Sequence, residues 1–421
     1  MSRQITAPRG TRDLLPPETE AWGHVEATAR DLARRYAFER IEIPLFERVE
    51  LFARGLGESS DAVEKEMFRV SGARGSTEDG AEWALRPEPT AGIVRAYLEH
   101  GMHVRPGPLR LTLIGPMFRY DRPQAGRYRQ FSQWDVEVLG DRGPAIDAEL
   151  IELASRFYRE VGLSGVVARV NSIGDAVCRP VYRQALVDHF TPHVERLSDD
   201  SQRRLALNPL RVLDDKELDP ELAAGAPRSV DHLCDDCREH FHRVRALLDA
   251  LAVPYEVDHR LVRGLDYYTR TAFEFVVEGR EGQQQALGGG GRYDGLAEIL
   301  GGRATPGIGF GVGLDRTLIA LEEQGVAPPA AGPLVAVVGF EDDQADRLRV
   351  AATLREAGLA VRPDGTSRKL GKQLEAASKA GASWAAIVGE ELREGRIGLK
   401  DLATGEQETV AVEEAAKRIG G

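Results

Sequence analysis

Residues 117–139, MFRYDRPQAGRYRQFSQWDVEVL, decide how the chain around them folds. Two apolar runs flank nine residues, numbers 121–129. So short a connection cannot carry the crossover that joins parallel strands, so the stretch predicts two antiparallel strands around a loop. Antiparallel pairing is therefore the first structural expectation for this chain.

The second of these strands alternates in polarity. Gln133, Asp135 and Glu137 share one face, while Trp134, Val136 and Val138 share the other. A surface strand with a solvated polar side would alternate in the same way. The preceding loop favours a binding site instead, because it holds three basic residues and a single acid: Arg122, Arg127, Arg129 and Asp121. Arg119 adds a fourth cation from the entering strand. A cationic rim beside an amide and carboxylate floor suits phosphate together with a small polar ammonium compound.

Composition bounds the class of protein. The chain has 421 residues, 42% hydrophobic and 29% charged, an ordinary balance for a soluble protein of two or three domains. No apolar run reaches the roughly 18 residues of a membrane span, and the start MSRQITAPRG lacks a signal peptide's apolar segment. Three cysteines argue against a disulfide framework. We therefore expect a cytoplasmic protein with no membrane association.

The net charge of −12 argues against a nonspecific nucleic-acid coat, which requires a basic surface. Phosphate would bind only where basic residues concentrate, and residues 119–129 hold four arginines against one aspartate. We expect any nucleic-acid binding to be local and salt-sensitive.

The N-terminal part predicts a helix over residues 18–36, followed by IEIPLFERVELF at residues 41–52. We interpret the latter as a strand interrupted by Pro44, because proline marks an edge strand or an interface rather than a central strand. An edge strand covered by its own chain fits the pattern equally well.

Residues 67–85 predict two strands joined by a polar hairpin tip, and RPEPT then opens a helix over residues 91–100. Glu88 stands between two prolines, which favour an extended conformation and suit it to present a carboxylate to an ammonium group. Thr90 is placed to cap the helix.

The next part of the chain changes from mixed to helical character. PAIDAELIELASRFYREVGL predicts an amphipathic helix and VVARVNSIGD a strand, whereas residues 176–255 indicate an inserted helical domain. Within it, CDDCREHFH offers four potential zinc ligands: Cys234, Cys237, His240 and His242. Zinc modules usually take two pairs from separate segments, and C-x-x-C at a helix start can be simple packing. We predict no metal here, although these residues alone leave the question open.

Three later stretches carry further signals. LVRGLDYYTRTAFEFVVEG predicts a strand, ALGGGGRYDGL is a glycine run leading into a helix, and TPGIGFGVGLDRTLIALEEQG predicts a strand running into a helix. Arg316 falls in the first turn of that last helix, where a cation opposes the helix dipole. Asp315 beside it is one explanation, but an anionic ligand is the better one.

A linker, VAPPAAG at residues 326–332, precedes the last part of the chain. Strands and helices then alternate as βαβαβ, which predicts a small parallel or mixed sheet. On these grounds a regulatory or interaction domain fits as well as an RNA-binding one.

These motifs together resemble the class II aminoacyl-tRNA synthetases, in the form found in histidyl-tRNA synthetases. The matching pieces are RPEPT, FRYDRPQAGRYRQFSQWDVEVLG as motif 2, LVRGLDYYTR, GGGGRYDGL and GFGVGLDR as motif 3. The proline-bearing segment at residues 41–52 is similar to motif 1, which builds the family's dimer interface. The departures are small: Pro89 replaces a common glycine, Asp121 and Asp315 common glutamates, and Ser132 a frequent histidine.

The resemblance implies an α+β fold, with a class II antiparallel sheet flanked by helices, a helical insertion and a C-terminal α/β anticodon-binding domain. The implied domains are catalytic residues 1–175 and 256–325, insertion residues 176–255, linker residues 326–332 and anticodon-binding residues 333–421. It also implies a homodimer that ligates L-histidine to histidine tRNA through a histidyl adenylate, with ATP as substrate, Mg²⁺ accompanying it, and AMP and pyrophosphate released.

The site residues implied by the resemblance fall into four groups. Arg119 and Arg263 would be catalytic. The ATP-binding residues would be Arg119, Asp121, Arg127, Phe131 and Arg316. The histidine-binding residues would be Glu88, Thr90, Gln133, Glu137, Arg263, Tyr267 and Tyr268, with Glu137 and Tyr268 on the imidazole. Arg122 and Gln124 would meet the tRNA acceptor end.

An alternative is the regulatory subunit of ATP phosphoribosyltransferase, a catalytically inactive histidine sensor on the same scaffold. Such proteins resemble the synthetase without its C-terminal domain and have lost catalytic positions. This chain keeps Arg263, Arg316 and the part from residue 334 onward, which favours the synthetase.

Overall fold

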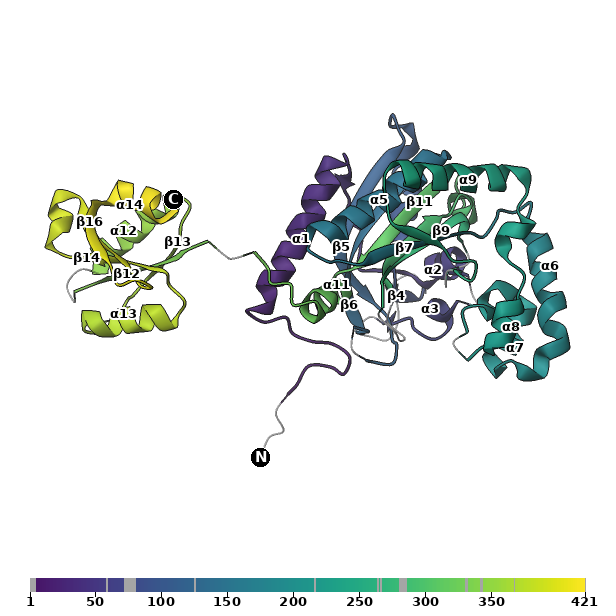
Figure 1. Ribbon diagram of the computed structural model, residues 1–421, viewed down its shortest axis with the longest axis horizontal. Helices are drawn as coiled ribbons and strands as arrows, with labels where there is room; N and C mark the ends of the chain where they lie inside the picture. The colour runs from purple at the N-terminus through teal and green to yellow at the C-terminus, as the bar shows by residue number, and fades with distance from the viewer. Residues whose placement is uncertain are drawn as a thin grey trace. The chain divides into compact units, whose positions relative to one another are not determined.

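The computed structural model divides into two units, residues 1–328 and 329–421, each of which is considered by itself (Figure 1). It describes residues 5–57, 60–71, 81–124, 126–215, 217–262, 265, 267–279, 286–329, 332–340, 344–366 and 368–420. Among these residues, no helix has both the length and the apolar character needed to cross a membrane.

An eight-stranded sheet forms the centre of the first unit, in the order β1-β5-β6-β11-β10-β9-β7-β8. The strands are β1 (Glu39–Arg40), β5 (Leu109–Phe118), β6 (Gln130–Leu139), β11 (Gly307–Gly313), β10 (Ala286–Arg292), β9 (Thr269–Val277), β7 (Val166–Ser172) and β8 (Tyr255–Val257). The edge pairs β1–β5 and β7–β8 are parallel, and the inner pairs are antiparallel. The predicted antiparallel pair, β5 and β6, is confirmed, as is the expected fold class.

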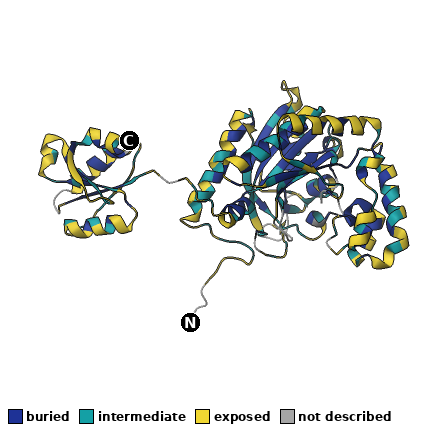
Figure 2. Ribbon diagram, viewed as in Figure 1, coloured by how far each residue is buried: buried dark blue, intermediate teal, exposed yellow. Residues whose placement is uncertain are grey.

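One face of this sheet carries the larger hydrophobic core. Trp134, Val136 and Val138 on β6 are fully buried there, with the Trp134 ring 5.0 Å from that of Phe157 on α5 (Pro144–Glu160). Helices α1 (Glu18–Arg35), α9 (Asp235–Ala250) and α11 (Leu314–Glu323) supply further residues to the same core (Figure 2). The helix expected at residues 18–36 is confirmed.

The opposite face of β6 is also covered. Asp135 and Glu137 are almost inaccessible to solvent, so the surface-strand alternative is wrong. Leu111 and Leu113 of neighbouring β5 pack in a second core with α2 (Val49–Leu56) and α4 (Thr90–Glu99). The polar residues of β6 are therefore interior groups that require partners.

The segment 41–52 does not form the predicted interrupted strand. Pro44 lies between β1 and the short strand β2 (Phe46–Arg48), and α2 begins at Val49. Strand β2 belongs to a small antiparallel sheet with β4 (Trp83–Leu85) and β3 (Arg69–Val70). Helix α2 forms because Val49, Phe52 and Leu56 recur at helical spacing and bury Phe52 and Leu56, a period that the proline obscured.

Residues 176–255 are mostly helical, as expected, and end in β8. Their elements are α6 (Arg179–Phe190), η2 (Thr191–Arg196), α7 (Asp199–Leu207), η3 (Pro209–Val212), α8 (Pro220–Gly225), η4 (Ser229–His232) and α9. The last of these, α9, packs on α5 and buries Phe241, Val244 and Leu248 in the larger core. The shorter elements α3 (Asp61–Glu64), η1 (Met102–Val104) and α10 (Leu296–Ile299) complete the unit.

The second unit contains a five-stranded mixed sheet in the order β13-β12-β14-β15-β16. Its elements are β12 (Leu334–Gly339), α12 (Gln344–Glu356), β13 (Ala360–Pro363), α13 (Leu370–Lys379), β14 (Trp384–Val388), η5 (Glu390–Glu394), β15 (Arg396–Asp401), β16 (Gln407–Ala411) and α14 (Val412–Gly420). Residues on alternate sides of β12 enter two separate cores, so helices cover both faces. The mixed sheet is confirmed, and β15, β16 and α14 extend it beyond the predicted βαβαβ unit.

Candidate active site

Three buried carboxylates, Glu88, Asp135 and Glu137, form what we call the acidic floor. Glu88 lies just before α4, and its two oxygens accept hydrogen bonds from the amides of Thr90 (2.8 Å) and Ala91 (3.0 Å). Glu88 therefore caps α4, where the helix dipole favours a negative charge. The expected cap by Thr90 is wrong: its side chain makes no cap, and its hydroxyl instead donates to Glu137 at 2.5 Å.

Glu137 lies at the centre of a buried hydrogen-bond network. One oxygen accepts from Thr90, and the other accepts from the hydroxyl of Tyr293, which follows the glycine run. Burial raises the pKa of Glu137 to about 8, against the opposing effect of these two donors and with a contribution from the charge of Glu88. The free protein therefore holds a proton here near neutral pH.

Asp135 is the most strongly perturbed member of the floor. Burial first, and then the charges of Glu137 and Glu88, raise its pKa well above the usual range. Arg86 is a buried cation that opposes this rise and donates to the backbone carbonyls of Pro116 and Ile43. The described residues provide no hydrogen-bond partner for Oδ2 of Asp135 or Oε1 of Gln133. Two buried acceptors of this kind suit a ligand that carries several N–H donors.

Glycines on β11 make room for the acidic floor. A side chain at Gly309 would place its Cβ 1.8 Å from a Glu137 oxygen, and one at Gly311 would lie 2.6 Å from an Asp135 oxygen. The alternating glycines in GIGFGVG are therefore required by the carboxylates on the adjacent strand β6.

A small cavity of about 60 Å³ opens above the floor. Its lining includes five of the predicted histidine-binding residues: Glu88, Thr90, Gln133, Tyr267 and Tyr268. Glu137 does not line the cavity itself, but it accepts hydrogen bonds from two residues that do, Thr90 and Tyr293. Arg263 lies outside the described residues. The individual roles of this group remain predictions.

A second cavity, of about 360 Å³, adjoins the first and shares Arg119 and Gln133 with it. It is lined by all five predicted ATP-binding residues: Arg119, Asp121, Arg127, Phe131 and Arg316. Four of the described arginines line it, and we call three of them, Arg119, Arg127 and Arg316, the cationic rim. Arg119 and Arg127 come from the loop between β5 and β6, and Arg316 comes from α11, so two segments distant in the sequence meet at one ligand-sized space.

Backbone carbonyls, an aromatic ring and the carboxylate of Asp121 contact the cationic rim. Arg119 donates to the carbonyl of Pro87 at 3.0 Å and lies 5.4 Å from the centre of the Phe131 ring. Arg127 pairs with Asp121 at 2.8 Å. Arg316 donates to the carbonyls of Ala286 (2.7 Å) and Gly126 (3.1 Å).

Arg316 carries an electrostatic strain that an anion would relieve. Burial lowers its pKa, and the charges of Arg127 and Arg119 lower it further. Asp315 does not compensate, because it accepts from Arg12 at 3.0 Å and from the amide of Ser132 at 2.9 Å. These contacts favour the anionic-ligand interpretation of Arg316 over the alternative based on Asp315.

The two residues predicted at the tRNA acceptor end lie away from both cavities. Arg122 and Gln124 are exposed in the loop between β5 and β6, where the amide of Arg127 donates to the carbonyl of Gln124 at 2.9 Å. Their side chains reach neither cavity lining.

The ligand group Cys234, Cys237, His240 and His242 is not assembled. His240 is buried 3.0 Å from Asp147, which also pairs with the buried Arg292 at 2.6 Å, and His242 is exposed on α9. His240 therefore belongs to a buried ion network, while the two cysteines face a different segment, described below.

Sequence reasoning placed Asp135 on the polar face of the floor but gave it no role, and it missed Tyr293 and Arg86 as members of the site. Asp135 had a clear signal, because it lies between Gln133 and Glu137 on the same face of one strand. Tyr293 and Arg86 had none, because their contacts to Glu137 and Asp135 depend on how separate strands and loops pack.

Comparisons with known proteins agree with this geometry. The family model described as histidyl-tRNA synthetase matches residues 10–317, and the one described as anticodon binding domain matches residues 334–420. A histidine–tRNA ligase of Desulforudis audaxviator is 47% identical over 418 residues, which cover 99% of this chain and 98% of the relative. That of Geobacillus thermodenitrificans is 46% identical over 416 residues, covering 97% and 96%.

Solved structures give the same result. The apo histidyl-tRNA synthetase of S. aureus has a TM-score of 0.81 and 34% identity, covering 99% of this chain and 100% of that one. A Bacillus halodurans protein described as an ATP phosphoribosyltransferase regulatory subunit/histidyl-tRNA synthetase has a TM-score of 0.64 at 20% identity, covering 92% and 98%, and shares the fold. From its sequence, its architecture and the relatives that it matches over nearly its whole length, this chain belongs to the histidyl-tRNA synthetase family.

Proposed function

We propose that this chain ligates L-histidine to histidine tRNA, using ATP and passing through a histidyl adenylate. The observation that carries the proposal is the junction of two cavities of opposite character at Arg119 and Gln133. The acidic floor suits the α-ammonium group and imidazole of histidine, and the cationic rim suits the phosphates of ATP. At the junction, a histidine carboxylate would meet an α-phosphate.

Two displacement steps make up the reaction. In the first, a carboxylate oxygen of histidine bonds to the α-phosphorus of ATP while the bond to pyrophosphate breaks. In the second, the terminal ribose hydroxyl of the tRNA attacks the adenylate carbonyl, loses its proton, and releases AMP. Neither step needs a protein nucleophile, so the chain acts by positioning and by stabilising charge.

The proposed roles are those that the family resemblance implies, and for the described residues their positions around the two cavities support them. Arg119 at the junction, together with Arg263, is proposed to stabilise charge on the α-phosphate oxygens. Arg127 and Arg316 take the pyrophosphate end, and Phe131 stacks on adenine. Glu88, Thr90 and Gln133 hold the ammonium group. Glu137 and Tyr268 bind the imidazole, with Glu137 acting from behind Thr90 and Tyr293. Tyr267 belongs to the same histidine-binding group.

Mg²⁺ fits the larger cavity chemically. Asp121 and Glu274 line it with carboxylate oxygens, the ligand type that Mg²⁺ prefers alongside phosphate. When bound with ATP, the ion would neutralise phosphate charge.

We further propose the division into a catalytic body (residues 1–175 and 256–325), a helical insertion (176–255), a linker (326–332) and an anticodon-binding domain (333–421). A cytoplasmic homodimer is proposed as well. In the segment that resembles motif 1, Leu45 and Phe46 are exposed, and Pro44 and Leu51 line part of a hollow of about 760 Å³. Such a surface suits an isologous contact between two copies.

The decisive experiment is histidine-dependent ATP–pyrophosphate exchange by the purified chain. Exchange that requires histidine and rejects other amino acids supports ligation. Histidine binding without exchange would instead favour the regulatory-subunit alternative.

A truncation tests the proposed division of labour. Deleting the chain after Gly332 should leave exchange measurable while charging of histidine tRNA falls strongly, because both cavities lie within the first unit. If the truncated protein stays folded and exchange disappears, the division is wrong.

A further inference from the structure

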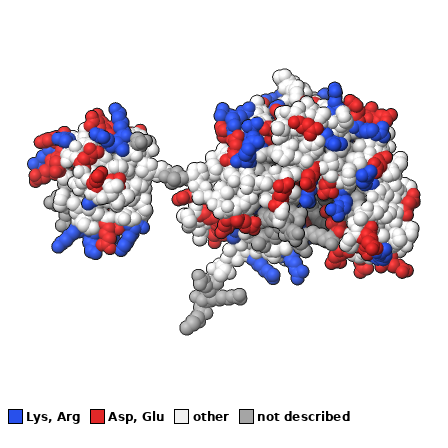
Figure 3. All heavy atoms as spheres, in the orientation of Figure 1, with Lys and Arg blue, Asp and Glu red and all other residues white. Residues whose placement is uncertain are grey.

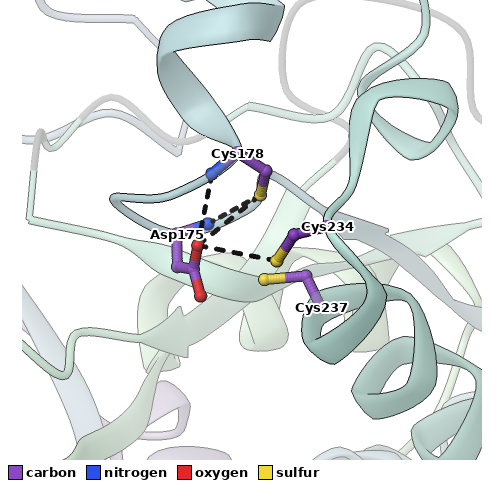
Figure 4. Close-up of side chains that lie close together, drawn as sticks. All are labelled: Asp175, Cys178, Cys234 and Cys237. Carbon is purple, nitrogen blue, oxygen red and sulfur yellow. Dashed lines mark hydrogen bonds between the residues drawn. The ribbon is translucent and has the colours of Figure 1, made fainter.

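Four side chains from two segments converge outside the candidate active site: Asp175, Cys178, Cys234 and Cys237 (Figure 4). Their ligand atoms all lie within 4.8 Å of one another. One pair has the spacing D-x-x-C in the turn after β7, and the other has the spacing C-x-x-C at the start of α9. Two such pairs from separate segments are the arrangement that zinc modules use.

The separations are close to those that a metal ion requires. Oδ1 of Asp175 lies 3.6 Å from Sγ of Cys178 and 3.9 Å from Sγ of Cys234. A tetrahedral zinc with Zn–S bonds of about 2.3 Å and a Zn–O bond of about 2.0 Å separates neighbouring ligand atoms by roughly 3.5–3.8 Å. Small side-chain adjustments would therefore close the four groups around one ion.

The surrounding backbone is built to hold the ligands in place. The amide of Asp175 donates to Sγ of Cys178 at 3.3 Å. Gly174 has a φ of +69°, and a Cβ there would lie 2.6 Å from that same sulfur. Cys234 and Cys237 occupy the N-cap and first turn of the 16-residue helix α9, so one rigid element carries both sulfurs.

The charge around the cluster is arranged to leave one carboxylate oxygen facing the sulfurs. Arg270 pairs with Oδ2 of Asp175 at 3.2 Å, whereas Oδ1 is the oxygen within reach of Cys178 and Cys234. Cys178 and Cys237 are buried beside Leu233, and Cys234 is partly buried. Three sulfurs and one carboxylate in a largely enclosed pocket match the donor preference of a borderline-soft divalent cation and exclude Mg²⁺ or Ca²⁺.

We propose that Asp175, Cys178, Cys234 and Cys237 bind one Zn²⁺ ion in a closed, four-coordinate structural site. The ion would join the turn before α6 to the start of α9 and so tie together both ends of residues 179–233. The same turn contacts the histidine side of the active site: Arg179 donates to the carbonyl of Tyr268, and the amide of Arg270 donates to the carbonyl of Gly174 at 2.7 Å. The site would thus fix the base of the helical segment and the chain beside Tyr268.

The first test is the metal content of the full-length protein, purified under reducing conditions without chelator. We expect about one zinc per chain, and on replacement with Co²⁺ the intense visible bands of tetrahedral coordination together with thiolate-to-metal charge transfer. Absence of zinc, combined with failure of the reduced protein to take up Zn²⁺ or Co²⁺, would overturn the proposal. A Cys234–Cys237 disulfide in the protein kept under reducing conditions, found by mass spectrometry after thiol alkylation, would do so as well and would indicate a redox pair.

Matched variants identify the ligands. Cys237→Ser should reduce bound zinc to about a tenth or less of one equivalent, whereas His242→Ala, which changes an exposed residue of the same helix, should leave it unchanged. Asp175→Cys should retain about one equivalent and strengthen the thiolate-to-cobalt bands, because a fourth sulfur replaces the carboxylate. This variant keeps the test valid even if Cys237→Ser fails to fold. Loss of zinc in His242→Ala, or unchanged cobalt bands in Asp175→Cys, would contradict the assigned ligand set.

Discussion

The acidic floor and the cationic rim adjoin at Arg119 and Gln133 but gather side chains of opposite charge type. The floor buries three carboxylates, and burial together with their mutual repulsion raises the pKa values of Asp135 and Glu137. The rim gathers three arginines, and burial together with repulsion lowers the pKa of Arg316. On the visible face of each unit, by contrast, acidic and basic side chains are interspersed (Figure 3).

This contrast shows where the ligands complete the structure. Each half of the site gathers groups whose ionised forms would repel one another, and a ligand of the opposite sign stabilises those ionised forms. The favourable interaction between the ligand's charge and these ionised groups contributes to the free energy of binding and to positioning. The floor and the rim should therefore respond differently to substitution: one through histidine, the other through ATP.

The largest effect is expected at the rim. Arg119→Ala should lower histidine-dependent ATP–pyrophosphate exchange by about 10²–10³-fold, the scale of removing one preorganised donor to developing charge. Arg119→Lys, which keeps the charge but loses the planar fork, should recover part of the rate. Unfolding should be measured for both, because Arg119 also contacts the carbonyl of Pro87. A normal exchange rate in a folded Arg119→Ala protein would remove this residue from the chemistry.

An intermediate effect is expected at the floor. Glu88→Gln should raise the KM for histidine by roughly 10–100-fold, because a buried charge-assisted hydrogen bond to ammonium is lost. The KM for ATP should change little, since Glu88 lines the smaller cavity and the proposed ATP-binding residues line the larger one. Equal changes in both constants would mean that floor and rim do not act separately.

A smaller effect should appear in the pH dependence of histidine binding. Glu137, with a pKa of about 8 in the free protein, carries a proton at pH 7, and a bound cationic or N–H donor ligand favours its carboxylate. Histidine binding should therefore release up to about one proton and strengthen roughly 3–10-fold between pH 6.5 and 8. Titration calorimetry in buffers of different ionisation enthalpy measures the release.

The control is Glu137→Gln, which retains the titration of histidine itself but lacks that of the carboxylate. Proton release equal to that of the parent would exclude Glu137 as its source.

The stability of the free protein gives a second check. When folding raises the pKa of a carboxyl group, the group stabilises the folded protein fully at pH values below its pKa in the unfolded chain. That stabilisation is lost as the pH rises through its pKa in the folded protein. The parent should thus lose stability relative to Glu137→Gln between about pH 4.5 and 8.

The comparison also shows which features sequence could predict. The antiparallel pair β5–β6 followed from loop length and from the alternation of Trp134, Val136 and Val138, both local properties. The start of α2 could not be predicted in this way, because Pro44 suggested an interrupted strand and the helical spacing begins only five residues later, at Val49. Glu88 rather than Thr90 caps α4 because the chain enters that helix with the Glu88 side chain turned toward its first amides.

The remaining misses are contacts between distant segments. The hydrogen bond from Tyr293 to Glu137 requires the order and packing of strands, which no local pattern specifies. Asp175 and Cys178 lie more than fifty residues before Cys234, and D-x-x-C carries little signal alone. The cysteine pair therefore suggested the neighbouring histidines as partners, when its partners come from the other end of the helical segment.

The smallest effect on adenylate formation should come from the tip of the loop between β5 and β6. Arg122 and Gln124 are exposed at its tip and contribute to neither cavity, so Gln124→Ala should leave ATP–pyrophosphate exchange nearly unchanged. Its amide can pair with a base edge, and an arginine can engage either phosphate or guanine. If this loop reads the acceptor end of histidine tRNA, which in this family carries an extra guanine at its start, aminoacylation should fall by roughly 3–10-fold for tRNA with that guanine and less for tRNA lacking it.

The matched variant Arg122→Ala separates a phosphate contact from base reading. Loss of a phosphate contact should weaken charging of both tRNAs and reduce the salt dependence of tRNA binding, because fewer counterions are released. Equal loss on both tRNAs for Gln124→Ala would exclude base reading by the glutamine. A parallel loss of exchange would place the loop tip in the ATP site. The tip and the cationic rim would then act together, while the distinction between the cationic rim and the acidic floor would be unaffected.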